Sequence, residues 1–188
     1  MSTFASPADA GFKPQVMDLL FSTTLTSATD IVSTGTLPTG YKSYSIDFRG
    51  RSDNTASNIA RVRVFFNSDL TVSNYQLQRI LGSTPTFVDT LGQSEPAFFT
   101  MPGPFGGASD YFGGGSMQVY SPEATTGYKS YSCLTGRHSS TGTASGGRTI
   151  HVLHGVWRNT AAITEINFKM VGSPDLEVGT SFAVYGIR

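Results

Sequence analysis

Short runs of alternating apolar and polar residues dominate the chain from about residue 22 onward. Ile46 and Phe48 alternate with Asp47 and Arg49, and the segment 163–170 shows the same pattern. Successive side chains of a β-strand point to opposite faces, so each run presents one apolar face and one polar face. No later window shows the 3.6-residue stripe of an amphipathic helix. The pattern therefore predicts an all-β chain.

Turn-forming residues divide this part of the chain into short segments. Gly, Pro, Asn, Asp and Ser separate runs rich in Thr, Val, Ile, Tyr and Phe, which is typical of strands joined by tight connections. We predict an antiparallel two-sheet sandwich of jelly-roll type over residues 22–188. The expected strands are 23–33, 41–51, 60–67, 75–81, 96–100, 117–121, 128–135, 149–157, 163–170 and 180–187.

Residues 1–21 have a different character. Pro7, Gly11 and Pro14 precede a single apolar stretch at 16–21. We predict a short N-terminal arm, extended apart from one helical turn, that anchors the domain on a partner protein. The alternative is a terminal segment packed on its own core. Deletion of residues 2–20 separates the two, because loss of an arm leaves the thermal midpoint unchanged. The candidate anchoring residues are Phe12, Val16, Leu19 and Leu20.

The composition indicates a neutral surface rich in hydroxyl groups. Thirteen basic and thirteen acidic residues cancel, which argues against strong electrostatic capture of nucleic acid or of an anionic membrane. Charged residues make up 14% of the chain, against about 25% in typical soluble proteins, and 23 Ser, 23 Thr and 21 Gly take their place. Neither a long apolar run nor a secretory leader is visible, so no membrane insertion is expected.

Cysteine and histidine give little support for a metal centre or for redox chemistry. Cys133 is the single cysteine, which excludes an intrachain disulfide, and its strand-like surroundings favour a small core residue. His151 and His154 are three residues apart, and on a strand this spacing puts them on opposite faces. We expect no metal and no cofactor.

The charged side chains form no recognisable catalytic motif. Glycoside hydrolysis needs two carboxyl groups, and strands distant in sequence could bring two together, so a depolymerase acting on polysaccharide stays open as one hypothesis. The expectation is nevertheless that the protein is not an enzyme and has no catalytic residue. The arginines at 49–63 have aspartates close by in sequence, which favours local ion pairs. These residues are Arg49, Arg51, Arg61 and Arg63, with Asp47, Asp53 and Asp69.

Two segments rich in small residues, 102–116 and 136–148, are predicted to be loops. They are either flexible connectors or surface loops at one end of the sandwich that contact a partner, and the aromatic residues of the first favour a packed loop. Trp157, the single tryptophan, is either a core anchor or a stacking platform for a ligand. The candidate partner or glycan contacts are Phe105, Tyr111, Phe112, His138 and Trp157.

One heptapeptide, Thr-Gly-Tyr-Lys-Ser-Tyr-Ser, occurs identically at 39–45 and at 126–132. The flanking residues do not continue the match, so the chain is not a repeat protein. We predict that both copies form a turn followed by a strand, at equivalent places in the paired sheets, with tyrosines facing one side and Ser and Lys the other.

Several segments in order resemble a family of small virion structural proteins of tailed bacteriophages. That family carries an F-N-x-D…N-Y segment and ends in a G-[ST]-x-F-x-x-Y-G-I strand. The resemblance covers roughly residues 37–188 and excludes the Gly-rich segment 102–116. The matching segments are 64–69, 73–76, 128–132, 155–159, 162–166 and 179–187.

The resemblance implies a jelly-roll β-sandwich on the virion surface, made in the bacterial cytoplasm and commonly a homotrimer. Family members are regarded as head-fibre or head-decorating proteins, tail fibres or receptor-binding proteins. The expected function is to decorate or cement the capsid through the N-terminal arm, with other virion proteins as partners. The alternative is a tail-associated knob that recognises host surface polysaccharide.

Overall fold

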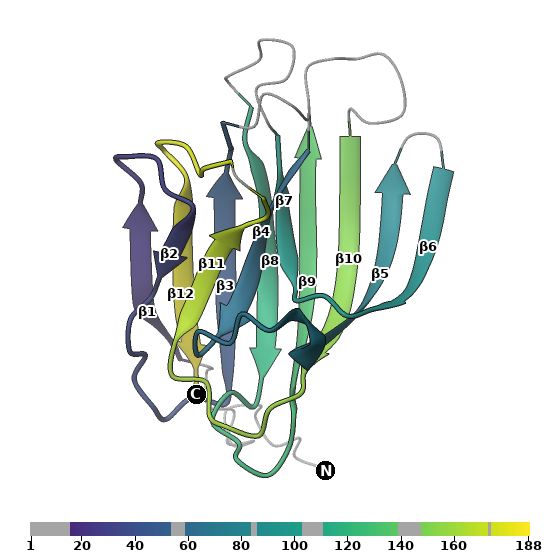
Figure 1. Cartoon of the computed structure of the whole chain (residues 1–188). Helices are drawn as coiled ribbons and strands as arrows, with labels where there is room; N and C mark the ends of the chain where they lie inside the picture. Colours follow the sequence, from purple (N-terminus) through teal and green to yellow (C-terminus); the bar gives the residue numbers. More distant parts are fainter. Residues whose placement is uncertain (1–15, 54–58, 84–85, 103–110, 139–147, 173) are drawn as a thin grey trace, which may run out of the picture.

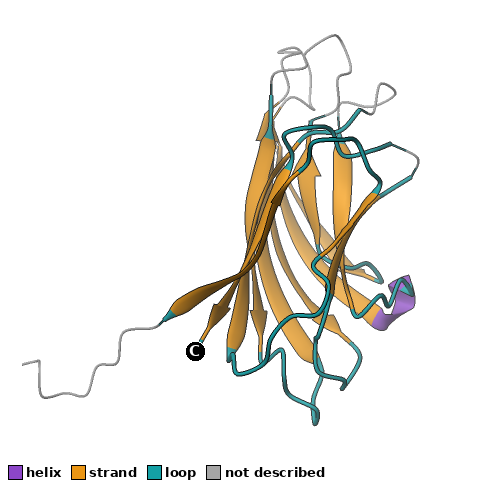
Figure 2. Cartoon of the chain, turned by 90° about the vertical axis from the view of Figure 1, so that its left-hand side faces the viewer, coloured by secondary structure: helices purple, strands orange, loops and turns teal. Residues whose placement is uncertain are grey.

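The computed structural model describes residues 16–53, 59–83, 86–102, 111–138, 148–172 and 174–188. Two antiparallel sheets pack face to face, with the smaller one in front in Figure 1 and on the right in Figure 2. The large sheet has the strand order β1-β12-β3-β8-β9-β10-β5-β6, and the small sheet has the order β2-β11-β4-β7. A 3-10 turn, Val72–Asn74, precedes β5. The predicted all-β sandwich is confirmed.

The strand bounds match most of the expected strands. They are β1 Met17–Thr24, β2 Ile31–Ser33, β3 Ser43–Gly50, β4 Ala60–Phe66, β5 Tyr75–Ser83, β6 Thr86–Gln93, β7 Phe98–Met101, β8 Gly113–Tyr120, β9 Lys129–His138, β10 Arg148–Trp157, β11 Ile166–Met170 and β12 Ser181–Ile187.

The jelly roll consists of eight of these strands. Through β1, β2, β3, β4, β7, β8, β11 and β12, the chain crosses between the sheets at every step except from β4 to β7, which pair in the small sheet, and the first strand lies beside the last. Two hairpins, β5–β6 and β9–β10, add four strands to one edge of the large sheet. The large sheet therefore extends beyond the small one on the side of β5 and β6 (Figure 1).

The end of the predicted arm belongs to the sandwich. β1 begins at Met17 and pairs with β12 from Met17↔Ile187 to Thr24↔Ser181, so the expected helical turn and the boundary at residue 21 are corrected. Leu20 and Phe21 pack against the core. The apolar stretch at 16–21 is the first strand of the jelly roll. Residues 1–15 lie outside the described residues.

Both predicted loops are shorter than the sequence suggested. Gly113, Gly114 and Gly115 are the first residues of β8, and β9 continues to His138. A Cβ atom on Gly115 would stand 2.8 Å from the Cβ of Thr135, so a residue without a side chain is needed for β8 to lie close to β9. The glycines at 113–115 therefore belong to a strand that packs closely on its neighbour, and not to a loop.

The core between the sheets is largely aromatic. Trp157, Tyr75 and Phe66 lie within 6.4 Å of one another by ring centroids at one end of the sandwich. Phe168 stacks on Phe182 at 4.3 Å, and Phe182 contacts Phe48. All these rings are at most 4% exposed. Burial of side chains this large is the main stabilising contribution available to the fold.

Both copies of the heptapeptide lead into strands of the large sheet, β3 and β9, which corrects the expected placement in two paired sheets. Tyr41, Tyr44 and Tyr131 are buried, but Tyr128 is 59% exposed, so the predicted placement of all tyrosines on one side is wrong for the second copy. Lys129 shares the inner face with Tyr131, contrary to the prediction, and its Nζ donates to the carbonyl oxygens of Gly127 and Thr160.

The molecule has two distinct ends. The start of β1 lies beside the end of β12, where the Arg188 N–H donates to the Val16 carbonyl oxygen at 3.3 Å. At the opposite end β8 begins, β9 ends and β10 begins (Figure 1). We call these the terminal end and the distal end.

Candidate functional site

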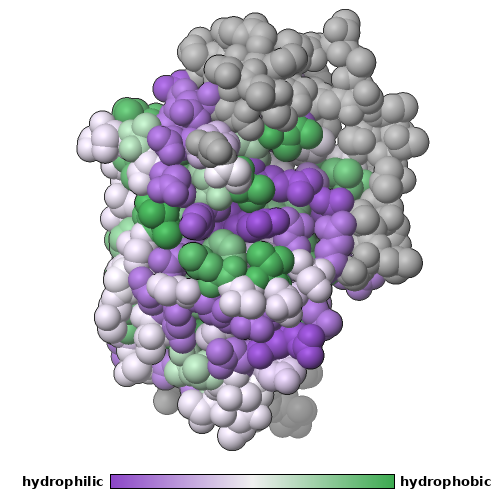
Figure 3. All heavy atoms as spheres, viewed as in Figure 1, coloured by the Kyte–Doolittle hydropathy of each residue, from purple (hydrophilic) through white to green (hydrophobic). Residues whose placement is uncertain are grey.

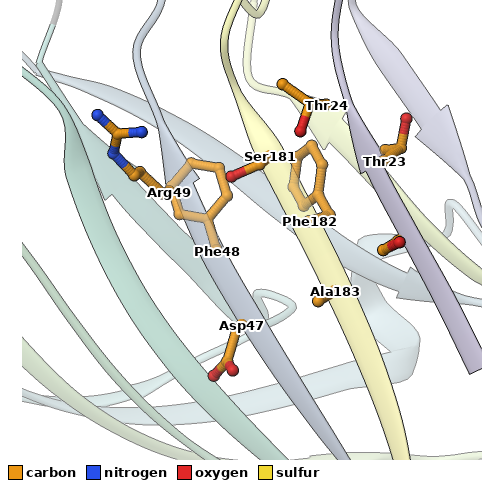
Figure 4. Close-up of a pocket in the computed structure, with 9 residues that line it drawn as sticks. Thr23, Thr24, Asp47, Phe48, Arg49, Ser181, Phe182 and Ala183 are labelled. Carbon is orange, nitrogen blue, oxygen red and sulfur yellow. The ribbon is translucent and has the colours of Figure 1, made fainter. Parts of the chain in front are cut away.

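A shallow groove of about 420 Å³ opens on the large sheet, toward the distal end of its first three strands. Its polar side chains come from β1, from β12 and from β3, with β12 in the middle (Figure 4). We call it the β12 groove. Its lining residues are Ser22, Thr23, Thr24, Asp47, Phe48, Arg49, Ser181, Phe182 and Ala183.

Strand register aligns these residues in two rows. One row is Ser22–Ala183–Asp47, and the next comprises Thr24, Ser181 and Arg49. Directly paired residues in neighbouring strands point to the same face, and these alternate with the buried Phe48 and Phe182. The six side chains therefore face outward, and the short side chains of β12 form the floor of the groove.

The polar groups of the groove are free to bind. No hydrogen bond or ion pair within the described part of the chain engages the side chains of Ser22, Thr24, Asp47 or Ser181. Other carboxylates are occupied: Asp18 accepts from Arg188 at 2.9 Å, and Glu165 accepts from Ser33 at 2.6 Å. Asp47 thus differs from acids that hold the fold together.

Arg49 lies over the Phe112 ring, with its guanidinium carbon 4.0 Å from the ring centroid. Arg51 also faces this ring, at 5.2 Å, and forms an ion pair with Glu177 at 2.7 Å. A cation above an aromatic face is held electrostatically while its N–H groups remain available around the edge. Phe112, a predicted contact residue, therefore positions Arg49 beside the β12 groove.

The remaining predicted contact residues are separated by the fold. Tyr111 and His138 lie together at the distal end, with ring centroids 5.4 Å apart, and both are exposed. Trp157 has no exposed surface, and its Nε1 donates to Asp69 Oδ2 at 2.9 Å, so it is a core anchor and not a stacking platform. Phe105 lies outside the described residues.

Two of the predicted anchoring residues, Val16 and Leu19, lie exposed at the terminal end. Val16, Met17 and Leu19 are between 51% and 58% exposed, and they form a cluster of apolar surface at the start of the edge strand β1. Leu20 instead packs against the core. Phe12 lies outside the described residues.

Two further hollows continue across the large sheet on the side away from Ser22. One, of about 330 Å³, involves Ser45, Gln118, Ser132 and His154, and a second, of about 400 Å³, involves Gln76, Gln78 and His154. Strand pairing places Ser45, Gln118, Ser132, His154 and Gln78 in one row across five strands. This row therefore offers hydroxyl, amide and imidazole groups, and the exposed apolar side chains of Leu134 and Val152 lie beside it.

The expected local ion pairs of the arginines are wrong. Arg63 donates to Glu95 at 3.0 Å, and Arg61 lies 3.9 Å from the same carboxylate and 4.6 Å from the Phe98 ring centroid. Two of the aspartates close in sequence have other partners, because Asp53 accepts from the Asp175 N–H at 2.7 Å and Asp69 accepts from the Trp157 indole N–H at 2.9 Å. The segment before β7 lies beside β4, so Glu95 is closer to these arginines in space than the aspartates that are near them in sequence.

His151 and His154 point to opposite faces of β10, as predicted. His151 is 4% exposed, and burial together with the nearby charges of Arg79, Arg61 and Arg137 lowers its pKa to about 4. Within the described residues, no group of three or more His, Cys, Asp or Glu side chains is placed to hold a metal ion.

Cys133 is a core residue, as expected, with 3% of its surface exposed. Burial raises the pKa of its thiol, which disfavours the reactive thiolate. The β12 groove also offers no obvious catalytic pair. Asp47 is the one carboxylate among its described lining residues, whereas glycoside hydrolysis uses two. The arrangement can donate and accept hydrogen bonds, which suits binding.

The outer face of the small sheet is mixed in polarity. Hydrophilic and hydrophobic residues are interspersed over it, without one dominant apolar patch (Figure 3). None of the helical segments in the described ranges is long and apolar enough to span a bilayer.

Comparison with known proteins adds no relative. No family model matches the chain, and neither the search of curated proteins nor that of solved structures finds a match. The resemblance to phage virion proteins therefore remains an expectation from sequence.

Sequence reasoning missed the β12 groove. Its residues are small or singly charged, and they come from three strands far apart in the chain. The alternation around 45–49 showed that Asp47 and Arg49 share a face. Only the pairing of β12 with both β1 and β3 brings the serines and threonines beside them.

Proposed function

We propose that this chain is a non-enzymatic structural protein on the surface of a tailed bacteriophage virion, where it decorates or cements the capsid. The observation that carries the proposal is the separation of the two ends. The terminal end has Arg188 and the exposed Val16, Met17 and Leu19, and the distal end carries Tyr111, His138 and the nearby β12 groove. A module of this form can be anchored at one end and exposed at the other.

The terminal end suits an anchor. Burial of exposed apolar side chains against a partner is favourable at about 25 cal/mol per Å² of apolar surface. β1 is also an edge strand, so its outer backbone groups can accept a further strand from a neighbouring subunit. A cementing protein that binds only assembled capsid stabilises the assembled state by mass action. Homotrimeric association belongs to the same proposal, because closed symmetry suits a surface knob.

Gold labelling of phage particles with an antibody against this chain tests the proposal. Label spread over the head supports capsid decoration. Label confined to the tail would replace decoration with the tail-associated receptor-binding role, which the open β12 groove also suits. Absence of label on intact particles, when the antibody binds the free protein, would overturn the assignment to the virion surface.

A further inference from the structure

We infer that the β12 groove binds a neutral saccharide unit through hydrogen bonds to Asp47 and Arg49. This inference deepens the proposed function, since it rests on exposure of the large sheet at the virion surface, and it assigns a ligand class to that sheet. The binding itself is a property of the isolated chain and can be measured without particles.

The pairing of one acid with one base defines the ligand. Asp47 only accepts hydrogen bonds and Arg49 only donates them, and neighbouring hydroxyl groups of a sugar can do both at once. The two charges stand two residues apart on one strand and cancel, so the groove attracts neither anions nor cations strongly. Ser22, Thr24 and Ser181 supply hydroxyl groups on the floor and the opposite wall. This set matches a neutral polyhydroxyl compound.

The dimensions agree with one sugar ring. The walls belong to β1 and β3, which are two strand spacings apart, or about 10 Å. The volume of about 420 Å³ falls within the range of small-molecule sites, roughly 300–1,000 Å³. Ala183 at the centre leaves space that a larger side chain would occupy.

The groove lacks an exposed aromatic platform. Arg49 covers the face of the nearest ring, that of Phe112, so binding depends on hydrogen bonds alone. Solvent competes with such bonds, and each contributes about 1 kcal/mol or a little more when a charged group takes part. A single unit therefore binds weakly, and a multivalent particle would bind tightly through many copies.

The two further hollows extend the site across the sheet. From β12 to β5 there are five strand spacings, or about 25 Å, over which Gln118, Ser132, His154 and Gln78 continue the line of hydroxyl and amide groups. An extended neutral glycan can follow this path. We therefore expect affinity to increase with the number of sugar units.

Titration of isotopically labelled full-length protein with methyl glycosides of glucose, galactose, mannose and N-acetylglucosamine, followed by amide NMR, tests the inference. We expect at least one of them to shift amides of β1, β3 and β12 around Ser22, Asp47 and Ser181. Asp47→Ala and Arg49→Ala should each weaken binding at least about tenfold. Ala183→Leu should block the groove while leaving strand pairing intact.

Asp30→Ala is the matched control, because Asp30 is an exposed acid elsewhere whose side chain has no bond within the described residues. It should bind as the wild type does. Three results would overturn the inference: no shifts in the groove with any glycoside, equal binding by the Asp47 and Arg49 variants, or clear preference for methyl glucuronide over neutral glycosides. Sugar binding without particle labelling would support the saccharide site and contradict the location on the virion. Particle labelling without sugar binding would contradict the saccharide site alone.

Discussion

Hydrogen bonds of single polar residues hold the turn after β4, at the terminal end, against the core. Asp69 is an example, because its carboxylate accepts from the Trp157 indole N–H at 2.9 Å and from Asn74 at 2.8 Å. Burial alone would raise the pKa of Asp69, but the hydrogen bonds from Trp157, Asn74 and Thr71 outweigh it and lower the pKa. The Asn-Ser-Asp turn thus fixes the largest core side chain.

We expect Asp69→Ala to lower the free energy of unfolding by about 1–3 kcal/mol, because the buried indole N–H of Trp157 loses its acceptor. Urea denaturation followed by tryptophan fluorescence measures this effect directly. Asp30→Ala serves as the control and should change stability little. Equal midpoints for both variants would contradict the structural role of Asp69.

His151 makes stability depend on pH. Its pKa is lowered from 6.5 to about 4, so the unfolded chain binds more protons than the folded one between these values. Stability contributed by the neutral imidazole is complete above pH 6.5 and decreases as pH falls toward 4, by about 3 kcal/mol in total. His151→Gln should flatten this part of the curve of unfolding free energy against pH. Parallel curves for variant and wild type would disprove the effect.

At the scale of elements, the sequence predicted those strands whose two faces differ. β3, β4 and β12 alternate apolar and polar residues, and their positions were expected to within two residues. β6 was missed, because Thr86–Gln93 lacks such alternation. β1 was taken for an arm because its apolar residues are consecutive and follow two prolines. The β12 groove could not be predicted, since strand order and register create it.

Deletion experiments distinguish β1 from the preceding residues. Removal of residues 2–15 should leave the thermal midpoint unchanged, because β1 and its pairing with β12 remain. Removal of residues 2–24 should unfold the domain or lower the midpoint strongly, because β12 loses a neighbour and Leu20 and Phe21 leave the core. Differential scanning calorimetry gives both values. If the longer deletion has the midpoint of the full chain, β1 is dispensable.

Gly155 marks a close contact within β10. A Cβ atom there would stand 2.5 Å from the Tyr131 hydroxyl oxygen and would overlap the Gln76 carbonyl oxygen. We expect Gly155→Ala to destabilise the protein by at least about 2 kcal/mol, since an overpacked core must shift its neighbours. Gly127→Ala is the control, with no atom within 4 Å of the new methyl group. Chemical denaturation of the two variants should separate them clearly.

At the scale of the whole molecule, the hairpin additions give the two sheets unequal sizes. Four extra strands widen the large sheet, so its outer face offers a continuous surface much broader than a minimal jelly roll provides. The β12 groove and the two hollows all lie on this sheet. Anchoring at the terminal end keeps that face accessible.

The arrangement of the ends predicts that a C-terminal fusion affects incorporation into particles and glycoside binding differently. A fluorescent protein fused after Arg188 would stand beside Val16 at the terminal end. We expect it to reduce incorporation into particles and to leave glycoside binding in the β12 groove unchanged. Particle counting by fluorescence and the NMR titration measure the two separately. Normal incorporation of the fusion would show that the terminal end is not the anchor.

The repeated heptapeptide has a consequence for the way in which the chain folds. Val119 of β8 stands between Tyr44 and Tyr131, and Gln118 stands between Ser45 and Ser132, so both copies flank one strand in the same register. A nascent β8 therefore meets two identical partners, and early pairing cannot tell them apart. Exchange of the two copies would give β8 the same register with the wrong neighbour, so the heptapeptide alone does not specify the strand order. What distinguishes the copies is their surroundings, because Gly186 lies against Tyr41 in the first copy and backbone carbonyls accept hydrogen bonds from Lys129 in the second.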